Sequence, residues 1–407
     1  MTDYPKHFLE IKNKIFQIGD NIVIEEDVDV IYKTLSFDFP EIIQNDFNSL
    51  ELKKYDTVTV YFNEFNTSDE RNAAAIQDCK KIFVGYIQEV IASEDKTSGV
   101  ILGITCRSTL GLAYERTTLV KAFSSTIPQI ISTGLTDIGL LSVIPYVYVS
   151  DDIDEAFIEV TSEYNFGKVL DSIKDKYPIK IFQTGDGGVW IVTPSFFEKE
   201  VNRTDKYTNT GSFKYIKEDE NPEKRFIARV WNYDLSSNIN KIDYGNTLQN
   251  VNCIVCYGLN TVGAAYDPIA YKNQFGTDTI YAQNLSVLTF FRRDFISNID
   301  CRKFAYEKLL DMSKNYIVSF ESKYVSDEVL GDLVAIYNSK LIKPDQLFTI
   351  KRRTITISKE DINANITVYR TGVAEFGDSV SPILLDLLTI DILNVQDQLE
   401  AEAITVD

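Results

Sequence analysis

The chain has 407 residues, a formal net charge of −19 and an isoelectric point of about 4.6. This acidic balance argues against a protein that grips nucleic acid through its phosphates, because that mode of binding needs an excess of Lys and Arg. It is compatible with a surface that DNA passes without adhering, and equally with simple solubility. The 24 Phe and 23 Tyr residues favour a β-rich fold, since aromatic side chains suit pleated, half-buried surfaces.

The cysteine count and the absence of long apolar runs bear on where the protein folds. Five cysteines are scattered along the sequence, which is no disulfide framework, so we expect folding in a reducing cytosol. Residues 1–7 lead into no signal-peptide-like apolar run, and the apolar stretch 138–149 is broken by Pro145. A membrane span needs about 20 apolar residues. We therefore expect a soluble protein without a membrane partner.

Residues 1–117 are predicted to form a small antiparallel β-barrel or sandwich. Val58, Val60 and Phe62 alternate with polar neighbours, which indicates a strand with one apolar face. Two further strands, at 82–90 and 100–106, are joined by a polar turn that ends in Gly99. Such a pair is typical of a long hairpin.

Residues 118–198 are predicted to form a small inserted α/β domain. Leu119, Val120, Phe123 and Ile127 have helical spacing, and Pro128 then interrupts or restarts that helix. Asn165 is placed to cap a second helix. The apolar stripe of the second helix consists of Phe166, Val169, Leu170 and Ile173. Strands at 179–184 and 189–193 follow, joined by the turn at 185–188.

The remainder divides into three predicted parts. Residues 199–239 are a polar linker with returning strands, the first of them at 225–231. Residues 240–370 contain a predicted helix after Asp300 and further strands. These strands are predicted at 251–257, 316–320, 347–357 and 366–370. Residues 371–407 contain an acidic amphipathic stretch at 382–400.

Most catalytic and metal sites that depend on histidine are excluded, because His7 is the only histidine. Ser-His-Asp and Cys-His mechanisms need a histidine base, and zinc or iron sites commonly need imidazole ligands. His7 is interpreted as a surface residue. Cys253 and Cys256 have zinc-knuckle spacing, but they lie in a strand, where positions three apart face opposite sides. They are interpreted as core cysteines.

Three other patterns have plain structural interpretations. The glycine-rich turn at 185–188 lacks the Lys and the helix of a phosphate-binding loop, so a tight hairpin turn is expected. Acidic groups at 151–155 and 25–27 are expected by chance among 60 acidic residues, and the first lacks the pattern of a calcium loop. The basic clusters 351–353 and 292–293 fit either contact with an acidic neighbouring subunit or a solvated strand end.

The order of these elements resembles the tail or baseplate hub family, the late-control D proteins of contractile-tailed phages and related injection machines. The resemblance is carried by residues 55–62, 82–87 and 104–108, then by 166–193, by 224–226 and by 300–312. It spans residues 12–370 and departs from the family in the acidic segment after Ser381 and in the loop at 204–221.

This resemblance implies an α+β, β-rich fold with two tube-like antiparallel β-barrels, residues 1–117 and 240–370, and an inserted α/β domain, residues 118–198. It also implies a structural virion protein in the tail baseplate, with no catalytic residue, metal or cofactor. Three copies would form a ring that adapts the sixfold tail tube to the threefold central spike. Its other partners would be further baseplate proteins and the tape measure protein, with DNA passing through without specific binding.

Two other functions remain open at this stage. The first is a β-rich receptor- or carbohydrate-binding tail protein, which would expose Tyr and Trp in a groove. The second is a cell-wall hydrolase with two carboxylates, which would show a cleft that holds a carboxylate of raised pKa.

Overall fold

The fold is known from a computed structural model that describes most of the chain. The described residues are 4–16, 22–39, 52–65, 67–95, 99–118, 122–149, 153, 157–161, 165–195, 230–236, 239–246, 251–267, 271, 275–276, 285–312, 316–323, 328–342, 347–358, 362–370 and 375–376. The chain separates into two compact units. Unit 1 is Met1–Gly245 with Ile317–Thr371, and unit 2 is Asn246–Tyr316 with Gly372–Asp407.

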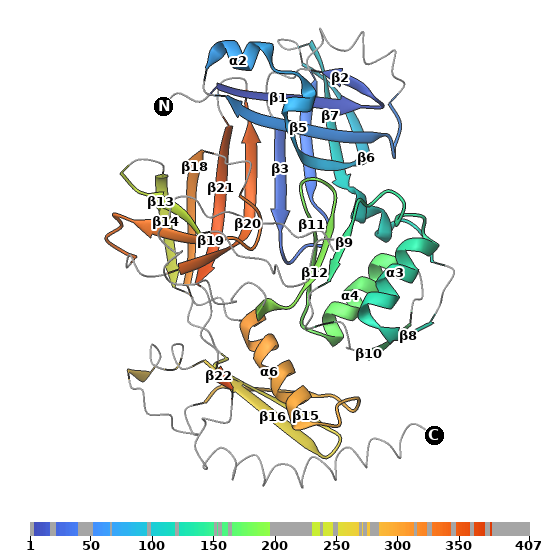
Figure 1. Ribbon diagram of the computed structural model, residues 1–407, viewed down its shortest axis with the longest axis vertical. Helices are drawn as coiled ribbons and strands as arrows, with labels where there is room; N and C mark the ends of the chain where they lie inside the picture. The colour runs from blue at the N-terminus through green and yellow to red at the C-terminus, as the bar shows by residue number, and fades with distance from the viewer. Residues whose placement is uncertain are drawn as a thin grey trace. The chain divides into compact units, whose positions relative to one another are not determined.

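A 13-stranded sheet dominates the described part of unit 1 (Figure 1). Its N-terminal strands are β1 (Tyr4–Ile11), β2 (Lys14–Phe16), β3 (Ile22–Asp27), β4 (Thr34–Phe39), β5 (Thr57–Phe65), β6 (Lys80–Asp95) and β7 (Gly99–Ser108). Its later strands are β13 (Val230–Asp234), β14 (Ile239–Asn246), β18 (Tyr316–Lys323), β19 (Leu333–Tyr337), β20 (Leu347–Ile357) and β21 (Ile362–Arg370). The strand order is β14-β18-β21-β20-β3-β4-β7-β6-β5-β1-β2, with β19 pairing both β13 and β20. The predicted α+β, β-rich class is confirmed.

The N-terminal part of the sheet follows the predicted alternation. Val58, Val60 and Phe62 on β5 are fully buried, and the residues between them are not. The predicted hairpin is formed by β6 and β7, which pair antiparallel. A short helix, α2 (Ser68–Ala73), and a 3₁₀ turn at Ile76–Asp78 connect β5 to β6. Because the apolar side chains of these strands share one face of the sheet, the hydrophobic core of the N-terminal part lies against that face.

The sheet joins the two ends of the sequence. Strand β20 pairs antiparallel with β3, so residues 352–357 lie beside residues 22–27. We call this β3–β20 junction the seam. The range 240–370, predicted as a second barrel, is shared between the two units. The tube-like character of the barrels and the domain boundaries stay predictions.

The α/β segment of unit 1 follows the 3₁₀ turn at Thr109–Tyr114 (Figure 1, right). It comprises β8 (Ala122–Thr126), α3 (Ile127–Asp137), β9 (Val147–Val149), β10 (Phe157–Thr161), α4 (Phe166–Lys176), β11 (Lys180–Gln183) and β12 (Val189–Val192). Helix α4 begins as predicted, because the Asn165 side chain accepts a hydrogen bond of 3.0 Å from the Lys168 backbone N–H. The turn after β11 is also as predicted, with the Thr184 N–H donating to the Gly188 carbonyl over 2.8 Å.

The helix predicted from the spacing of residues 119–127 is wrong where the structure describes it. Residues 122–126 form strand β8, which pairs with β10 and sets Phe123 opposite Val160. Both side chains are buried, and the Phe123 ring packs 6.1 Å from the Phe166 ring. Helix α3 starts only at Ile127, with Pro128 in its first turn, where proline is well tolerated. Pro128 therefore belongs to the start of the helix and does not interrupt it. Residues 122–126 are extended because they pair with strand β10, which lies far along the chain.

Unit 2 contains a four-stranded sheet and one long helix in its described residues. The strand order is β17 (Val287–Phe291), β15 (Cys253–Gly258), β16 (Thr261–Tyr266), β22 (Glu375–Phe376). The helix predicted after Asp300 is α6 (Asn298–Met312), which buries Cys301, Phe304, Ala305 and Leu309. Cys253 and Cys256 lie on opposite faces of β15, since Cys253 packs in an apolar cluster with Val255 and Tyr257 and Cys256 faces α6. The prediction of core cysteines on opposite faces is confirmed.

Several predicted segments lie outside the described residues. They are the linker at 199–224, the acidic group at 151–155 except Ile153, and the stretch at 382–400. Within the helices that are described, none has both the length and the apolar character to cross a membrane.

Candidate functional site

The candidate site is a cluster of buried charges at the seam. Glu26 on β3 and Arg353 on β20 are directly opposite each other in the strand register. Glu26 continues the buried face formed by Ile22 and Ile24, because side chains two apart on a strand share a face. Arg353 lies on the buried face of β20 with Ile355. Each charge therefore stands where the alternation would place an apolar residue.

The contacts within this cluster are short, and each charged side chain has an oppositely charged partner. Arg353 donates from Nε to Glu26 Oε1 over 2.5 Å, and its Nη2 forms an ion pair with the same oxygen at 2.5 Å. Its Nη1 donates to the Glu328 backbone carbonyl over 2.6 Å and lies 3.3 Å from Glu328 Oε2. Lys33 forms an ion pair with the other oxygen of Glu26, and Tyr233 donates its hydroxyl proton to Glu328. We call Glu26, Lys33, Tyr233, Glu328 and Arg353 the seam network.

The seam network is almost inaccessible to water. Glu26 is 2% exposed, Arg353 4%, Glu328 0% and Lys33 5%. Two acidic and two basic side chains balance formally. Isolated ions at this depth would be very costly, so the pairing is what allows the charges to be buried.

The two carboxylates titrate in opposite directions. Burial alone would raise the pKa of Glu26, but the ion pairs with Arg353 and Lys33 outweigh it, and the pKa lies below its ordinary value of 4.5. Burial raises the pKa of Glu328, and Arg353 and Tyr233 offset this only partly. Burial, followed by the adjacent Glu328, also raises the pKa of Tyr233. Glu26 is therefore held firmly as an anion, while Glu328 binds a proton more readily than a free carboxyl group does.

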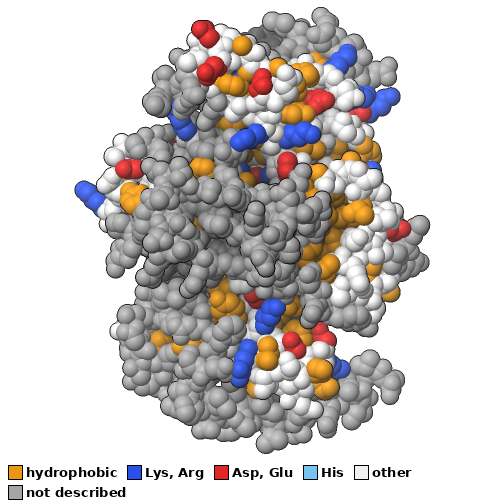
Figure 2. Space-filling model, in the orientation of Figure 1, with side chains coloured by type: hydrophobic (Ala, Val, Ile, Leu, Met, Phe, Trp, Pro, Cys, Tyr) orange, Lys and Arg blue, Asp and Glu red, His pale blue; other side chains and the backbone are white. Residues whose placement is uncertain are grey.

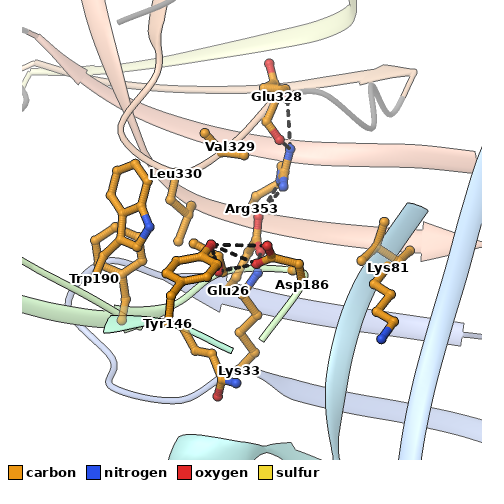
Figure 3. A pocket seen from close by; sticks show the side chains of 15 residues that line it. Glu26, Lys33, Lys81, Tyr146, Asp186, Trp190, Glu328, Val329, Leu330 and Arg353 are labelled. Atoms are coloured by element: carbon orange, nitrogen blue, oxygen red, sulfur yellow. Dashed lines mark hydrogen bonds and ion pairs between the residues drawn. The ribbon is translucent and has the colours of Figure 1, made fainter. Parts of the chain in front are cut away.

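A pocket of about 170 Å³ opens beside the seam network (Figure 3). It is lined by Glu26, Lys33, Glu328 and Arg353 from the network, by Lys81 and Ile82 of β6, by Val329 and Leu330, and by Tyr146, Phe182, Gln183, Thr184, Gly185, Asp186 and Trp190 of the α/β segment. The Tyr146 hydroxyl bonds to the Asp186 carboxylate over 3.0 Å and lies 3.1 Å from the Thr184 hydroxyl. The aromatic wall is mostly buried, since Trp190 is only 2% exposed.

Polar contacts fix the α/β segment against the sheet around this pocket. The Gln183 side chain accepts from the Leu110 N–H over 2.8 Å and donates to the Gly187 carbonyl over 2.9 Å. Lys174 donates to the Asp29 carbonyl over 2.7 Å, and Lys180 forms an ion pair with the Asp29 carboxylate. These groups come from three separate stretches of sequence. The pocket is thus a junction where the inserted segment meets both halves of the sheet.

The arrangement is better suited to holding parts together than to acid–base chemistry. Glu328 has the raised pKa expected of a hydrolase acid, and it lines a pocket together with Glu26. Both of its oxygens, however, contact Tyr233 or Arg353, and the residue is fully buried. A general acid must reach the proton-accepting atom of a substrate within hydrogen-bond distance. In the described residues, no group of three or more His, Cys, Asp or Glu side chains is placed to hold a metal ion.

The structure takes Arg353 out of both alternatives left open for the basic cluster 351–353. Arg353 is neither a solvated strand end nor a subunit contact, because it is buried inside unit 1 against Glu26 and Glu328. Arg352 is exposed on the other face. In the cluster 292–293, Arg292 forms a bidentate pair with Asp294, with contacts of 2.9 and 2.6 Å, and Arg293 is exposed.

Two sequence interpretations are corrected. His7 was interpreted as a surface residue, but it lies on β1 opposite Phe62 and is only 8% exposed. It shares the buried face of β1 with Leu9 and Ile11, a periodicity that was present in the sequence. The acidic group 25–27 was interpreted as a chance cluster, yet its middle residue, Glu26, is at the centre of the seam network. The alternation of Ile22, Ile24 and Glu26 was the available signal.

One face of the molecule carries mixed charge in its described residues, despite the acidic composition. Figure 2 shows acidic, basic and hydrophobic side chains intermingled over the N-terminal strands at the top of the view. On this face, within the described residues, the net charge of −19 does not gather into one acidic area. Association of a partner with this face would therefore depend on local charge complementarity, and not on the long-range electrostatic field of one extended acidic surface.

Comparison with known proteins identifies relatives by fold alone. No family model matches the sequence, and no curated protein matches it. The 43 kDa tail protein of prophage MuSo2 from Shewanella oneidensis superimposes with a TM-score of 0.58 at 13% identity, over 90% of this chain and 98% of that one. The tail protein from Neisseria meningitidis MC58 gives 0.60 at 12% identity, over 90% and 96%. Prophage tail protein gp18 from Listeria monocytogenes EGD-e gives 0.51 at 10% identity, over 96% and 99%. The chain therefore has the fold of these phage tail proteins.

Proposed function

We propose that the protein is a structural hub subunit of a phage-type tail or a related injection machine. The observation that carries the proposal is the fold shared with phage tail proteins over about nine-tenths of this chain and nearly all of theirs. A match of that extent includes the α/β segment and both units, rather than one common β motif. The order of sequence motifs, from residues 55–62 to 300–312, supports the same family.

In this proposal three copies form a ring. The ring would contact the sixfold tail tube on one side and the threefold central spike on the other. Further baseplate proteins and the tape measure protein would be its other partners, within the tail of a particle assembled in the host cytoplasm. A closed ring requires head-to-tail contacts between different surfaces of identical chains. The seam network suits this role, because a continuous, register-locked sheet keeps distant parts of a subunit in fixed geometry.

The test is the mass of the purified chain in solution by light scattering, with negative-stain images of the same sample. One chain has a mass of 46.3 kDa, so a trimer has three times that mass and should appear as a ring with a central hole. The measurement is repeated after co-incubation with the tube or spike protein of the same particle. This second condition detects a hub that forms a trimer only when its partner is bound. A compact monomer under both conditions would contradict the ring and favour the carbohydrate-binding alternative, which a glycan array tests directly.

The hydrolase alternative has its own test at the pocket. Glu328 is the one carboxylate among the pocket-lining residues whose pKa is raised. If the pocket were a cell-wall hydrolase site, the purified chain would clear a peptidoglycan suspension and Glu328→Gln would abolish the clearing. We expect neither protein to clear it, because Glu328 is buried and paired.

A further inference from the structure

Two cysteines that are far apart in the sequence meet inside unit 2. Cys256 lies on β15 and points toward α6, and Cys301 lies in the first turn of that helix. Both residues are 0% exposed, and their thiols share a hydrogen bond. The Cys301 sulfur also lies 3.3 Å from the Thr261 hydroxyl. Sequence reasoning considered Cys256 only with Cys253, its neighbour on the same strand, and missed this pair.

The backbones that carry the two cysteines approach each other closely. Gly263 is directly opposite Cys256 in the β15–β16 register. A Cβ atom on Gly263 would lie 2.6 Å from the carbonyl carbon of Cys301 and 2.2 Å from the Arg302 nitrogen. The helix backbone thus rests on Gly263, immediately beside Cys256. A Cβ atom on Gly258 would likewise lie 3.0 Å from the Cys301 sulfur.

This contact brings the two cysteine backbones toward the spacing that a disulfide needs. Paired residues in an antiparallel sheet have Cα atoms about 4.5–5.5 Å apart. A disulfide joins Cα atoms about 4.4–6.8 Å apart without moving the backbone. Cys301 is seated on Gly263, the strand partner of Cys256, so the helix backbone that carries Cys301 packs against the residue next to Cys256 on the same face of the sheet.

We propose that Cys256 and Cys301 form a disulfide when the folded protein meets a peroxide. The Cys301 thiolate attacks one peroxide oxygen and the O–O bond breaks, which leaves a sulfenic acid on Cys301 and a hydroxide ion. The hydroxide ion takes up the proton that the Cys301 thiol released and becomes the first water. The Cys256 sulfur then attacks the Cys301 sulfur, the S–O bond breaks, and a second water leaves with the Cys256 proton. Two thiols and one hydrogen peroxide give one disulfide and two waters.

The surroundings of the five cysteines favour this pair over any other. The hydrogen bond from Cys256, followed by the one from Thr261, lowers the pKa of Cys301, and the thiolate is the reactive form. Burial raises the pKa of Cys79 to about 11 and that of Cys253 to about 12. Burial also raises the pKa of Cys106. Cys253, the nearest competitor in sequence, faces away from the helix.

The bridge would fasten α6 to the sheet of unit 2. It would close the whole loop between the two cysteines, and a closed loop restricts the unfolded chain. The chemistry does not depend on the role in a tail, but its timing rests on the proposed function. A tail subunit folds in a reducing cytoplasm and leaves it with the released particle, so the bridge would form after assembly and reinforce unit 2 outside the cell.

The test treats the purified full-length chain with hydrogen peroxide, then denatures it and labels free thiols with N-ethylmaleimide. We expect three of the five cysteines to be labelled and a peptide from β15 to be linked to a peptide from α6 in a non-reducing digest. Dithiothreitol should restore labelling of all five. Thermal unfolding of the oxidised chain should show a midpoint several degrees higher for one transition.

Two variants give the matched comparison. Cys253→Ser alters the same strand on its opposite face and should still form the link, whereas Cys301→Ser should lose it. If Cys301→Ser fails to fold, the peptide map of the unmodified chain decides alone. Full labelling of a folded, peroxide-treated chain, a link between any other pair, or over-oxidation of Cys301 with Cys256 still free would each overturn the proposal. The readout is a disulfide within one chain. If the disulfide does not form, the proposal of a trimeric ring is unaffected. If the ring does not form, the disulfide proposal is unaffected.

Discussion

The seam and the α/β segment hold distant stretches of unit 1 together by different means. At the seam, β3 and β20 come from opposite ends of the sequence and meet through Glu26 and Arg353, a buried ion pair. In the α/β segment, α3 and α4 meet through an apolar cluster in which Phe166 and Ile130 are almost fully buried. The seam network adds Lys33, Tyr233 and Glu328, whereas the described members of the apolar cluster are hydrophobic side chains.

The difference between the two regions is one of specificity. Apolar packing is non-directional, and hydrophobic substitutions of similar volume usually cost little. An ion pair between strands is satisfied in one register only, because a slip of one residue turns every side chain to the opposite face. The seam network thus selects one alignment of two strands that no short loop connects. Buried ion pairs give little net stability, so selection of the register is the larger part of what they contribute.

The largest expected effect comes from removing the cation at the centre of the seam. Arg353→Met leaves Glu26 with Lys33 alone and leaves Glu328 buried without an ionic partner. Breaking a buried ion pair in this way costs about 3–5 kcal/mol. Urea unfolding of the full-length chain, monitored by circular dichroism, measures the loss in the free energy of unfolding. Arg352→Met, one position away and exposed, should change the free energy of unfolding by less than about 0.5 kcal/mol. Equal effects would mean that the burial of Arg353 has no energetic importance.

The second prediction concerns pH. A carboxylate whose pKa is lowered by folding stabilises the folded state above its ordinary pKa and loses that contribution as pH falls through the folded value. For Glu26 the loss therefore occurs below 4.5. Glu26→Gln should cost about 1.5–3 kcal/mol at pH 7, the range for hydrogen bonds to charged groups. The stability gap between wild type and variant should narrow as pH falls below that point, and denaturant midpoints at several pH values measure it. Glu328→Gln is the contrasting variant. Because folding raises the pKa of Glu328, the stability of the wild type relative to this variant should increase as pH falls.

The third prediction tests the apolar region through a close approach of two helices. A Cβ atom at Gly134 of α3 would lie 1.9 Å from a ring carbon of Phe166, so there is no room for a methyl group. Gly134→Ala should destabilise unit 1 by about 1–3 kcal/mol through overpacking. Ser132→Ala on the same helix is exposed and should have little effect. A second substitution, Phe166→Leu, should recover part of the loss, and no recovery would show that the ring is not the obstacle.

The smallest expected effect is at the start of α4. Asn165→Ala removes the side chain that accepts from the Lys168 N–H and should cost about 1 kcal/mol. Asn165→Asp retains an acceptor and should stay close to wild type. A thermal unfolding series of the three proteins distinguishes them, and identical midpoints for all three would mean that the cap contributes nothing.

Local elements of this protein were predictable because their signals are local. The alternation of Val58, Val60 and Phe62 predicted β5, and Asn165 with its apolar stripe predicted α4. The opposite orientation of Cys253 and Cys256 followed from strand geometry alone. In contrast, the residues around Phe123 have helical spacing but form a strand, because their partner β10 lies some thirty positions further along.

The candidate site shows where prediction from sequence stopped. Sequence alone determined that 351–353 is a basic strand segment and 25–27 an acidic one, since composition and alternation are properties of the chain. It could not determine which basic residue turns inward, because the β20–β21 register shifts between Ile350 and Arg352. A bulge adds one residue to a strand and reverses which positions face the core beyond it. In the folded chain the Lys351 carbonyl accepts from the Val28 N–H over 2.9 Å, and Arg353 rather than Arg352 faces Glu26. Only tertiary pairing between distant strands sets that register, and with it the seam network.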